Sequence, residues 1–164
     1  MKNLLIRQAT EADLAAINDI YNHYVLHSTC TYQTELSTLE ERSQWFTEHG
    51  TPWVVTVVEV EGKVVGWGAL SRFHLRAGYG KTAENSVYLH PDWQGQGLGT
   101  AVLKDLVARA KMNELHTIVA LISADQAPSL KLHEKIGFVR AGEIKEVGNK
   151  FGRWLNVTHL QLML

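Results

Sequence analysis

The sequence predicts a single domain of the α/β class over residues 1–164, with a mixed central β-sheet flanked by helices. The length of 164 residues and a hydrophobic content of 45% suit one domain with a sizeable core. Sequence periodicity gives the order strand, helix, helix, three strands, helix, strand, helix, two strands. A glycine-rich loop joins one strand to the next helix, which favours a right-handed crossover between parallel strands.

The first third of the chain predicts one strand and two helices. The strand is predicted at 3–10, and Thr10 with Asp13 forms an approximate capping box for the first helix. The apolar side chains of that helix recur at helical spacing: Leu14, Ile17, Ile20, Tyr21 and Tyr24. Ser37 with Glu40 forms a second capping box, which predicts a helix of about ten residues.

Three strands are predicted in the middle of the chain, and the first two form a hairpin. Their residues are 53–60, 63–70 and 83–90. The pair Glu61-Gly62 is a typical two-residue hairpin turn, and its neighbours are rich in valine. The segment 71–82 lacks a clear periodicity and predicts an irregular connection.

The last part predicts two more helices and three more strands. Residues after the glycines present one apolar helix face, made of Leu98, Val102, Leu103, Leu106, Val107 and Ala110. A buried strand is predicted at 116–124, and a helix at 127–137 has Pro128 in its first turn and Gly137 as its stop. Residues 138–164 predict two strands around a turn at 148–154.

Composition argues against several classes of partner. Sixteen basic residues stand against seventeen acidic ones, so the chain lacks the basic excess of a protein whose main partner is nucleic acid. The single cysteine, Cys30, cannot form an internal disulfide, which is typical of a reduced compartment. There is neither a leader pattern nor an apolar run near the ~20 residues of a membrane span. We therefore expect a soluble cytoplasmic protein with no membrane partner.

Three glycines at the start of a helix indicate an anion site. Glycine disfavours helix, yet Gly95, Gly97 and Gly99 precede or open one. A tight turn explains one or two of them, whereas a phosphate bound by the first backbone N–H groups of the helix explains all three. The spacing is not the G-x-G-x-x-G of a dinucleotide fold. A P-loop at Gly80 would need glycine where Leu75 stands.

The loop follows the pattern Q/R-x-x-G-x-G/A and thereby resembles the GNAT superfamily of acetyl-CoA-dependent N-acetyltransferases. Four further stretches resemble its phosphinothricin and methionine sulfoximine/sulfone acetyltransferase branch: "IYNHYVLHSTCTY", "AENSVYLHP", "PSLKLHEKIGF" and "VGNKFGRWLNV". The resemblance implies the GNAT fold, in which two parallel strands splay apart. It also implies acetyl-CoA as co-substrate and a small-molecule amine as acceptor.

Two residues are candidates for proton transfer. Strand alternation places Glu84 on the same face as Ser86 and Tyr88, and a partly buried carboxylate there could have a raised pKa. Alone, that pattern more often describes a solvated glutamate at a strand end. His133 lies beside apolar residues of a helix, where most histidines are structural. The resemblance implies that Glu84 is the catalytic base and that His133 takes part in proton transfer, for which the leaving thiolate is a candidate acceptor.

The resemblance also implies binding residues. Cofactor contacts fall on Val87, Tyr88, Leu89, Gln94, Gly95, Gln96, Gly97, Leu98, Gly99, Thr100, Gln126 and Lys135. Substrate contacts fall on His74, Leu75, Arg76, Glu84, Asn85 and Ser86. A guanidinium such as that of Arg76 matches a carboxylate, and Lys150 is a weaker candidate for the same role. Tyr32 and Phe73 are candidates for an apolar wall, although either could be simple core.

The chain departs from the branch at four positions, which puts the choice of substrate in question rather than cofactor binding. These are His74 in place of arginine, Gln126 in place of asparagine, Asn149 in place of an aromatic residue, and Asn156 in place of aspartate. Acetylation of a polyamine or a protein N-terminus is one alternative. A non-catalytic acyl-CoA-binding regulator is another, but it would not need both Glu84 and His133.

Two further expectations concern metal and assembly. His23 and His27 have i, i+4 spacing but lack the acidic partner of a zinc motif, so we expect no metal. The resembled branch commonly forms homodimers, and the apolar segment 158–164 could contribute to such an interface.

Overall fold

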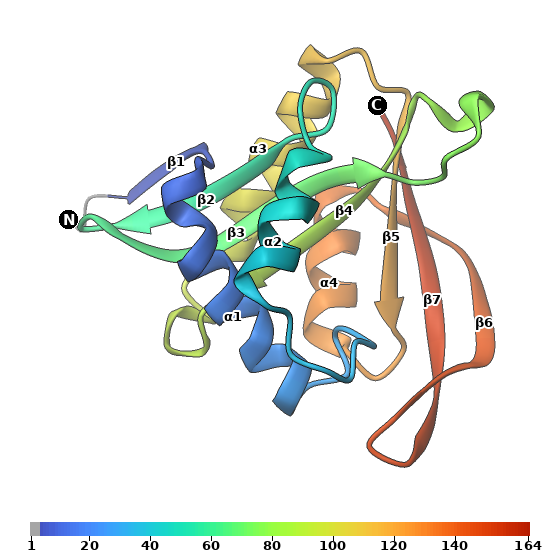
Figure 1. Ribbon diagram of the computed structural model, residues 1–164. Coiled ribbons are helices and arrows are strands. Elements are labelled where there is room, and N and C mark those ends of the chain that lie inside the picture. The colour runs from blue at the N-terminus through green and yellow to red at the C-terminus, as the bar shows by residue number, and fades with distance from the viewer. Residues whose placement is uncertain (1–3) are drawn as a thin grey trace.

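A computed structural model describes residues 4–164, which form one seven-stranded mixed sheet with helices on both faces (Figure 1). The strands are β1 (Leu4–Gln8), β2 (Val55–Val60), β3 (Lys63–Arg72), β4 (Thr82–Leu89), β5 (Thr117–Ser123), β6 (Val139–Lys150) and β7 (Arg153–Met163). The helices are α1 (Leu14–His27), α2 (Leu39–Thr47), α3 (Leu98–Met112) and α4 (Ala127–Ile136). This order confirms the predicted one, except that Asn3 of the first predicted strand lies outside the described residues.

The sheet order is β1-β2-β3-β4-β5-β7-β6. Only β4 and β5 pair in parallel, through the crossover that contains α3, and every other neighbouring pair is antiparallel. Helices α1 and α2 cover the face that is nearer the viewer in Figure 1, and α3 and α4 cover the opposite face. The two hairpins turn at Glu61-Gly62 and Phe151-Gly152, where all four residues have positive φ, as type I′ turns require.

Each face of the sheet has its own apolar core. Side chains of α3 pack against β3, β4 and β5 in one core, and the predicted helix face is buried there except for the half-buried Val107. In the other core, Ile17 and Ile20 of α1 pack against Val57 and Trp67 of the sheet. The predicted fold class, a mixed sheet flanked by helices, is therefore confirmed.

The cap of α2 differs from the prediction by one residue. Thr38 is the N-cap, and its backbone N–H donates to Glu41 Oε2 at 2.8 Å. Ser37 is instead held by asparagines of α1: its N–H donates to Asn22 Oδ1, and its carbonyl accepts from Asn18 Nδ2 at 2.8 Å. This non-local anchoring displaces the capping box, which the local pattern could not indicate.

At the other capping box, Arg7 of β1 binds Asp13 in a two-pronged ion pair. Both Nη–Oδ distances are 2.8 Å, and Thr10 N–H also donates to Asp13 Oδ2. The hydrogen bonds from Arg7, more than any other interaction, lower the pKa of Asp13 to about 2. The bound carboxylate thus fixes β1 to the start of α1.

We expect Asp13→Asn to lower the free energy of unfolding at pH 7 by about 2 kcal/mol, and to flatten its decline in acid. Because folding lowers the pKa of Asp13, the stabilisation is complete above the unfolded value near 4 and is lost as the pH falls towards 2. Urea unfolding between pH 2 and 7 measures this. Equal pH slopes for the two proteins would contradict the assignment.

The two parallel strands diverge after three residue pairs. β4 pairs with β5 only from Thr82 to Glu84, opposite Thr117 to Val119. Beyond this point β4 remains paired with β3 to Leu89, while β5 continues along β7 (Figure 1). The splayed arrangement expected from the resemblance is therefore present, and Glu84 is the last paired residue before the fork.

Candidate active site

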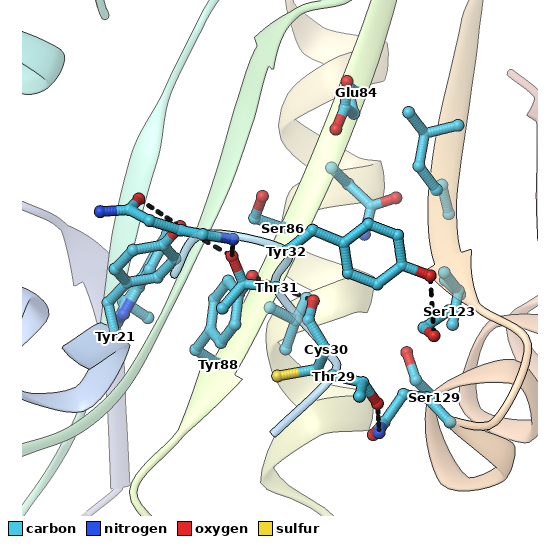
Figure 2. A pocket seen from close by; sticks show the side chains of 18 of the residues that line it. Tyr21, Thr29, Cys30, Thr31, Tyr32, Glu84, Ser86, Tyr88, Ser123 and Ser129 are labelled. Carbon is cyan, nitrogen blue, oxygen red and sulfur yellow. Dashed lines mark hydrogen bonds between the residues drawn. The ribbon is translucent and has the colours of Figure 1, made fainter. Parts of the chain in front are cut away.

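A cavity of about 650 Å³ opens at the fork between β4 and β5 (Figure 2). Its wall combines residues 84–88 of β4, residues 120–123 of β5, the loop 29–33 that follows α1, and side chains from α1, α2 and α4. Divergence of two parallel strands leaves backbone groups without ladder partners, which suits a ligand that carries amides. The fork thus supplies both space and hydrogen-bonding capacity.

Glu84 lies at one end of the cavity in Figure 2. The carboxylate is half-buried and accepts no hydrogen bond from the side chains of residues 4–164. Burial therefore raises the pKa of Glu84. A carboxylate in this state is a better proton acceptor than a fully solvated one, which is the property expected of a general base.

His133 is buried on α4 and uses both ring nitrogens. Nδ1 lies 2.8 Å from the carbonyl oxygen of Ser129, which can only accept, so Nδ1 carries the proton. Nε2 lies 2.9 Å from Asn85 Nδ2 and accepts a hydrogen bond from it. Burial lowers the pKa of His133, and this favours the neutral ring. In this arrangement neither ring nitrogen of His133 has an N–H group directed into the cavity.

The orientation of Asn85 follows from the same argument. With its carboxamide reversed, Oδ1 would face Nε2, and the buried ring of His133 would need protons on both nitrogens. In the orientation found, Asn85 Oδ1 is buried and has no hydrogen-bond partner in residues 4–164. Asn85 lines the cavity, but Oδ1 itself has almost no exposed surface, so this oxygen does not face a ligand in the present arrangement.

The three glycines at the start of α3 each have a structural reason. Gly95 and Gly97 have φ values of 71° and 81°, and open space lies where their Cβ atoms would be. A Cβ on Gly99 would instead lie 3.2 Å from Leu132 of α4, so close helix packing explains the third glycine. The expectation that structure accounts for only one or two glycines was therefore wrong. The case for an anion site rests on the helix N-terminus and the open space before it.

The two glutamines of the glycine loop are exposed, and each donates a hydrogen bond to a neighbouring group. Gln94 Nε2 donates to the hydroxyl of Tyr24 at 2.7 Å, and that hydroxyl donates to the carbonyl oxygen of Leu89. Gln96 Nε2 donates to the carbonyl oxygen of Asp92 at 3.2 Å. The helix N-cap, Gly97, has no side chain that could satisfy the first N–H groups of α3, so these remain suited to an anion.

The cavity brings together many of the predicted site residues. Its lining includes Glu84, Asn85, Ser86, Val87, Tyr88, Gln126, His133 and Tyr32. Three predicted substrate contacts, His74 to Arg76, lie instead on the exposed loop before β4, where Leu75 is 85% exposed. The His74 ring lies tilted against that of Tyr79, with 4.8 Å between centroids, and Lys135 is exposed on α4. These four residues lie outside the cavity lining, as do Leu89 and the predicted cofactor contacts at 94–100.

Lys150 does not have the free ammonium group that a carboxylate ligand would need. It is buried, and Nζ donates to the carbonyl oxygens of Ser28 and Thr31 at 2.7 Å each. The hypothesis that Lys150 binds substrate is therefore replaced by a structural role. Its ammonium fastens the β6–β7 hairpin to the loop 29–33, which forms one wall of the cavity.

Of the two predicted aromatic wall residues, only Tyr32 lines the cavity. Its hydroxyl donates to Ser123 Oγ at 2.9 Å, and a Cβ on Gly148 would lie 2.3 Å from its ring. Phe73 packs near Tyr79 outside the cavity, with 5.8 Å between ring centroids. The absence of a side chain at Gly148 therefore determines where the Tyr32 ring can lie.

Sequence reasoning missed several residues that line the cavity. They come from loop 29–33, from Tyr21 of α1, from Arg42 and Trp45 of α2, and from Trp67 of β3. A local signal was present: Arg42 and Trp45 are three residues apart and therefore share one helix face. An arginine on that apolar face indicates either a buried partner or a ligand.

The structure shows the surroundings of Asn149 and Asn156, two positions at which the sequence departs from the resembled branch. Asn149 is exposed on β6, and Asn156 bridges two strands through Glu143 Oε1 and the N–H of Glu146.

Residues 4–164 contain no group of three or more His, Cys, Asp or Glu side chains placed to hold a metal ion. None of the helices within that range has the length and apolar character needed to cross a membrane.

Comparison with known proteins identifies close relatives. Residues 17–138 match the family model described as Acetyltransferase (GNAT) family. The chain is 41% identical to the L-amino acid N-acyltransferase MnaT of Escherichia coli, with 97% of this chain and 93% of that protein covered. It is 38% identical to the L-methionine sulfoximine/L-methionine sulfone acetyltransferase of Salmonella typhimurium, with 98% and 95% covered.

A solved structure extends this similarity to three dimensions. The phosphinothricin acetyltransferase of Sinorhizobium meliloti in complex with acetyl-CoA superposes with a TM-score of 0.95. The two chains are 34% identical, with 98% of this chain and 88% of that chain covered.

Proposed function

The chain belongs to the acetyltransferase (GNAT) family, and we propose that it transfers acetyl from acetyl-CoA to the α-amine of a small amino-acid-like substrate. The observation that carries the proposal is the half-buried carboxylate of Glu84 at the fork between β4 and β5. The names of three similar enzymes, which specify L-amino acids, methionine sulfoximine or sulfone, and phosphinothricin, support this substrate class.

Residues at the fork and at the start of α3 suit acetyl-CoA. Backbone N–H groups from Gly95 to Thr100 are proposed to bind its diphosphate, because the N-terminus of α3 faces open space there. The backbone of residues 87–89 lies beyond the last β4–β5 pair and is proposed to bind the pantetheine amides. Gln126 and Lys135 are proposed as more distant cofactor contacts. Acetyl-CoA supplies an activated thioester, and the protein supplies orientation and proton transfer.

Glu84 is proposed to remove a proton from the substrate ammonium group, directly or through water, so that the amine can attack. Backbone N–H groups of residues 87–89 are proposed to stabilise negative charge on the thioester oxygen. His133 is proposed to protonate the leaving thiolate. For that role Nε2 must first gain a proton and Asn85 must rotate, because the buried ring holds its single proton at Nδ1.

Substrate contacts are proposed for Asn85 and Ser86 within the cavity, and for His74 to Arg76 at its approach. The loop that carries His74 leads directly into β4, whose third residue is Glu84. We also propose a homodimer in the cytoplasm. The edge strand β6, which exposes Val139, Ile144 and Val147, is a more suitable interface than the predicted segment 158–164, because β7 lies between β5 and β6.

We expect release of free thiol when the protein is mixed with acetyl-CoA and methionine sulfone, measured with a thiol reagent. A panel containing methionine sulfoximine, phosphinothricin, free L-amino acids, a polyamine and a short peptide would define the acceptor class. Turnover restricted to the polyamine or the peptide would contradict the proposed substrate class. Acetyl-CoA binding without turnover on any amine would favour a regulator.

A further inference from the structure

A buried arginine lines the cavity and has no part in the chemistry described so far. Arg42 of α2 is only 5% exposed, and its guanidinium carbon lies 4.5 Å from the centroid of the Tyr21 ring. The ring centroid of Trp45 is 4.7 Å away, and that of Trp67 is 5.7 Å away. Three aromatic rings therefore surround the charged end of this side chain.

Within residues 4–164, Arg42 has no carboxylate partner. The arginines that form ion pairs there are Arg7, Arg109, Arg140 and Arg153. The Arg42 side chain makes a single hydrogen bond in that range, from Nε to Asn18 Oδ1 at 3.2 Å. Its two terminal nitrogens are not fully buried, and Arg42 lines the cavity, so a ligand there can reach them. Burial lowers the pKa of Arg42, but a guanidinium remains charged at neutral pH.

The orientation of Arg42 is fixed by Asn18 and Ser37. Asn18 Nδ2 donates to the carbonyl oxygen of Ser37 at 2.8 Å, which leaves Asn18 Oδ1 as the acceptor for Arg42 Nε. The aromatic rings restrict the planar group further. A buried cation without an anion is energetically costly, whereas a fixed guanidinium fork is well matched to a carboxylate.

We propose that Arg42 binds the α-carboxylate of the amino-acid substrate, in the same cavity in which Glu84 receives the proton of its α-amine. This inference rests on the proposed function, because it assigns the second charged group of the same substrate. It also distinguishes Arg42 from Arg76, which was predicted for this role but lies on the exposed loop outside the cavity lining. Substrate selection would then require both a free amine and an adjacent negative charge.

The test compares L-methionine sulfone with its primary amide, which keeps the α-amine but removes the negative charge. In the wild type we expect kcat/KM to favour the acid, and in Arg42→Met we expect this preference to fall by about tenfold to a hundredfold. The acid should show a raised KM, whereas the amide should change little. Because both substrates are measured on the same variant, partial unfolding cancels from the ratio.

Two further arginine variants serve as controls. Arg72 also stacks on a tryptophan, 5.8 Å from the centroid of Trp53, but it lies outside the cavity lining, so Arg72→Met should leave the ratio unchanged. If Arg76→Met abolishes the preference while Arg42→Met preserves it, Arg76 is the anchor and the proposal is wrong. An equal loss for acid and amide in Arg42→Met would show that Arg42 is only structural.

A second Arg42 variant and a binding measurement cover two further cases: an Arg42→Met protein that does not fold, and a wild type that acetylates no amine. If Arg42→Met does not fold, Arg42→Lys replaces it, with a smaller fall in the ratio expected because lysine lacks the planar fork. If the wild type acetylates no amine, the proposed function fails separately. Calorimetric binding of methionine sulfone and its amide to the wild type and Arg42→Met, both with acetyl-CoA, then tests the anchor alone. Equal affinities for acid and amide in the wild type would overturn it.

Discussion

Glu84→Gln is expected to lower kcat/KM for the acceptor amine by about 10²- to 10⁴-fold, the usual effect of removing a general base. The amide has nearly the same size as the carboxylate but cannot accept a proton at neutral pH. Affinity for acetyl-CoA should change little, because the proposed cofactor contacts, at residues 87–89 and 95–100 and at Gln126 and Lys135, do not include Glu84. Steady-state thiol release and calorimetry measure the two quantities separately.

The pH profile provides a second readout for the same substitution. Because burial raises the pKa of Glu84, wild-type kcat/KM should fall in acid at a pH above the usual glutamate value of 4.5. That acidic limb should disappear in Glu84→Gln. Glu59→Gln is a suitable control, since Glu59 is a half-buried carboxylate of the same sheet that pairs with Arg7 outside the cavity. Equal losses of activity and cofactor affinity in Glu84→Gln would make Glu84 structural.

Gly97→Ala is expected to weaken acetyl-CoA binding by tenfold or more, measured by calorimetry. The new Cβ would occupy the open space in front of the α3 N-terminus, where the diphosphate is proposed to lie. It would also disfavour the left-handed backbone at φ 81°, which costs roughly 1 kcal/mol for a residue with a side chain. Loss of binding therefore has both a steric and a conformational cause.

Gly62→Ala separates these two causes. Gly62 also has φ 81° and open space around the position of its Cβ, but it lies in the β2–β3 hairpin turn. Both variants should lose similar thermal stability, while only Gly97→Ala should lose cofactor affinity. If both variants bind acetyl-CoA as well as the wild type does, the diphosphate does not contact this loop.

Local sequence patterns were sufficient for most of the fold. Period-3.6 apolar spacing located α3, Pro128 and Gly137 delimited α4, and Glu61-Gly62 located a hairpin. Each of these signals depends on neighbouring residues only. The cap of α2 was misplaced because Ser37 is held by Asn18 and Asn22 from α1, a tertiary interaction without a local signature.

The candidate site was predictable where a motif was contiguous and not where distant segments meet. Strand alternation and the resemblance together led to Glu84, and the glycine pattern led to the start of α3. Arg42 and Lys150 were not understood from sequence, because their roles depend on side chains and carbonyls far away in the chain. Gly99 shows the converse: a glycine that suggested a ligand also has a packing reason in Leu132.

The place of β7 in the sheet has a consequence for synthesis of the protein. The last strand, Arg153–Met163, lies between β5 and β6 and pairs with both, and Lys150 just before it fastens the cavity wall. While β7 is still inside the ribosomal tunnel, neither the β5–β7 nor the β6–β7 pairing can form. The cavity wall that Lys150 fastens is therefore assembled late, when β7 can enter between its neighbours.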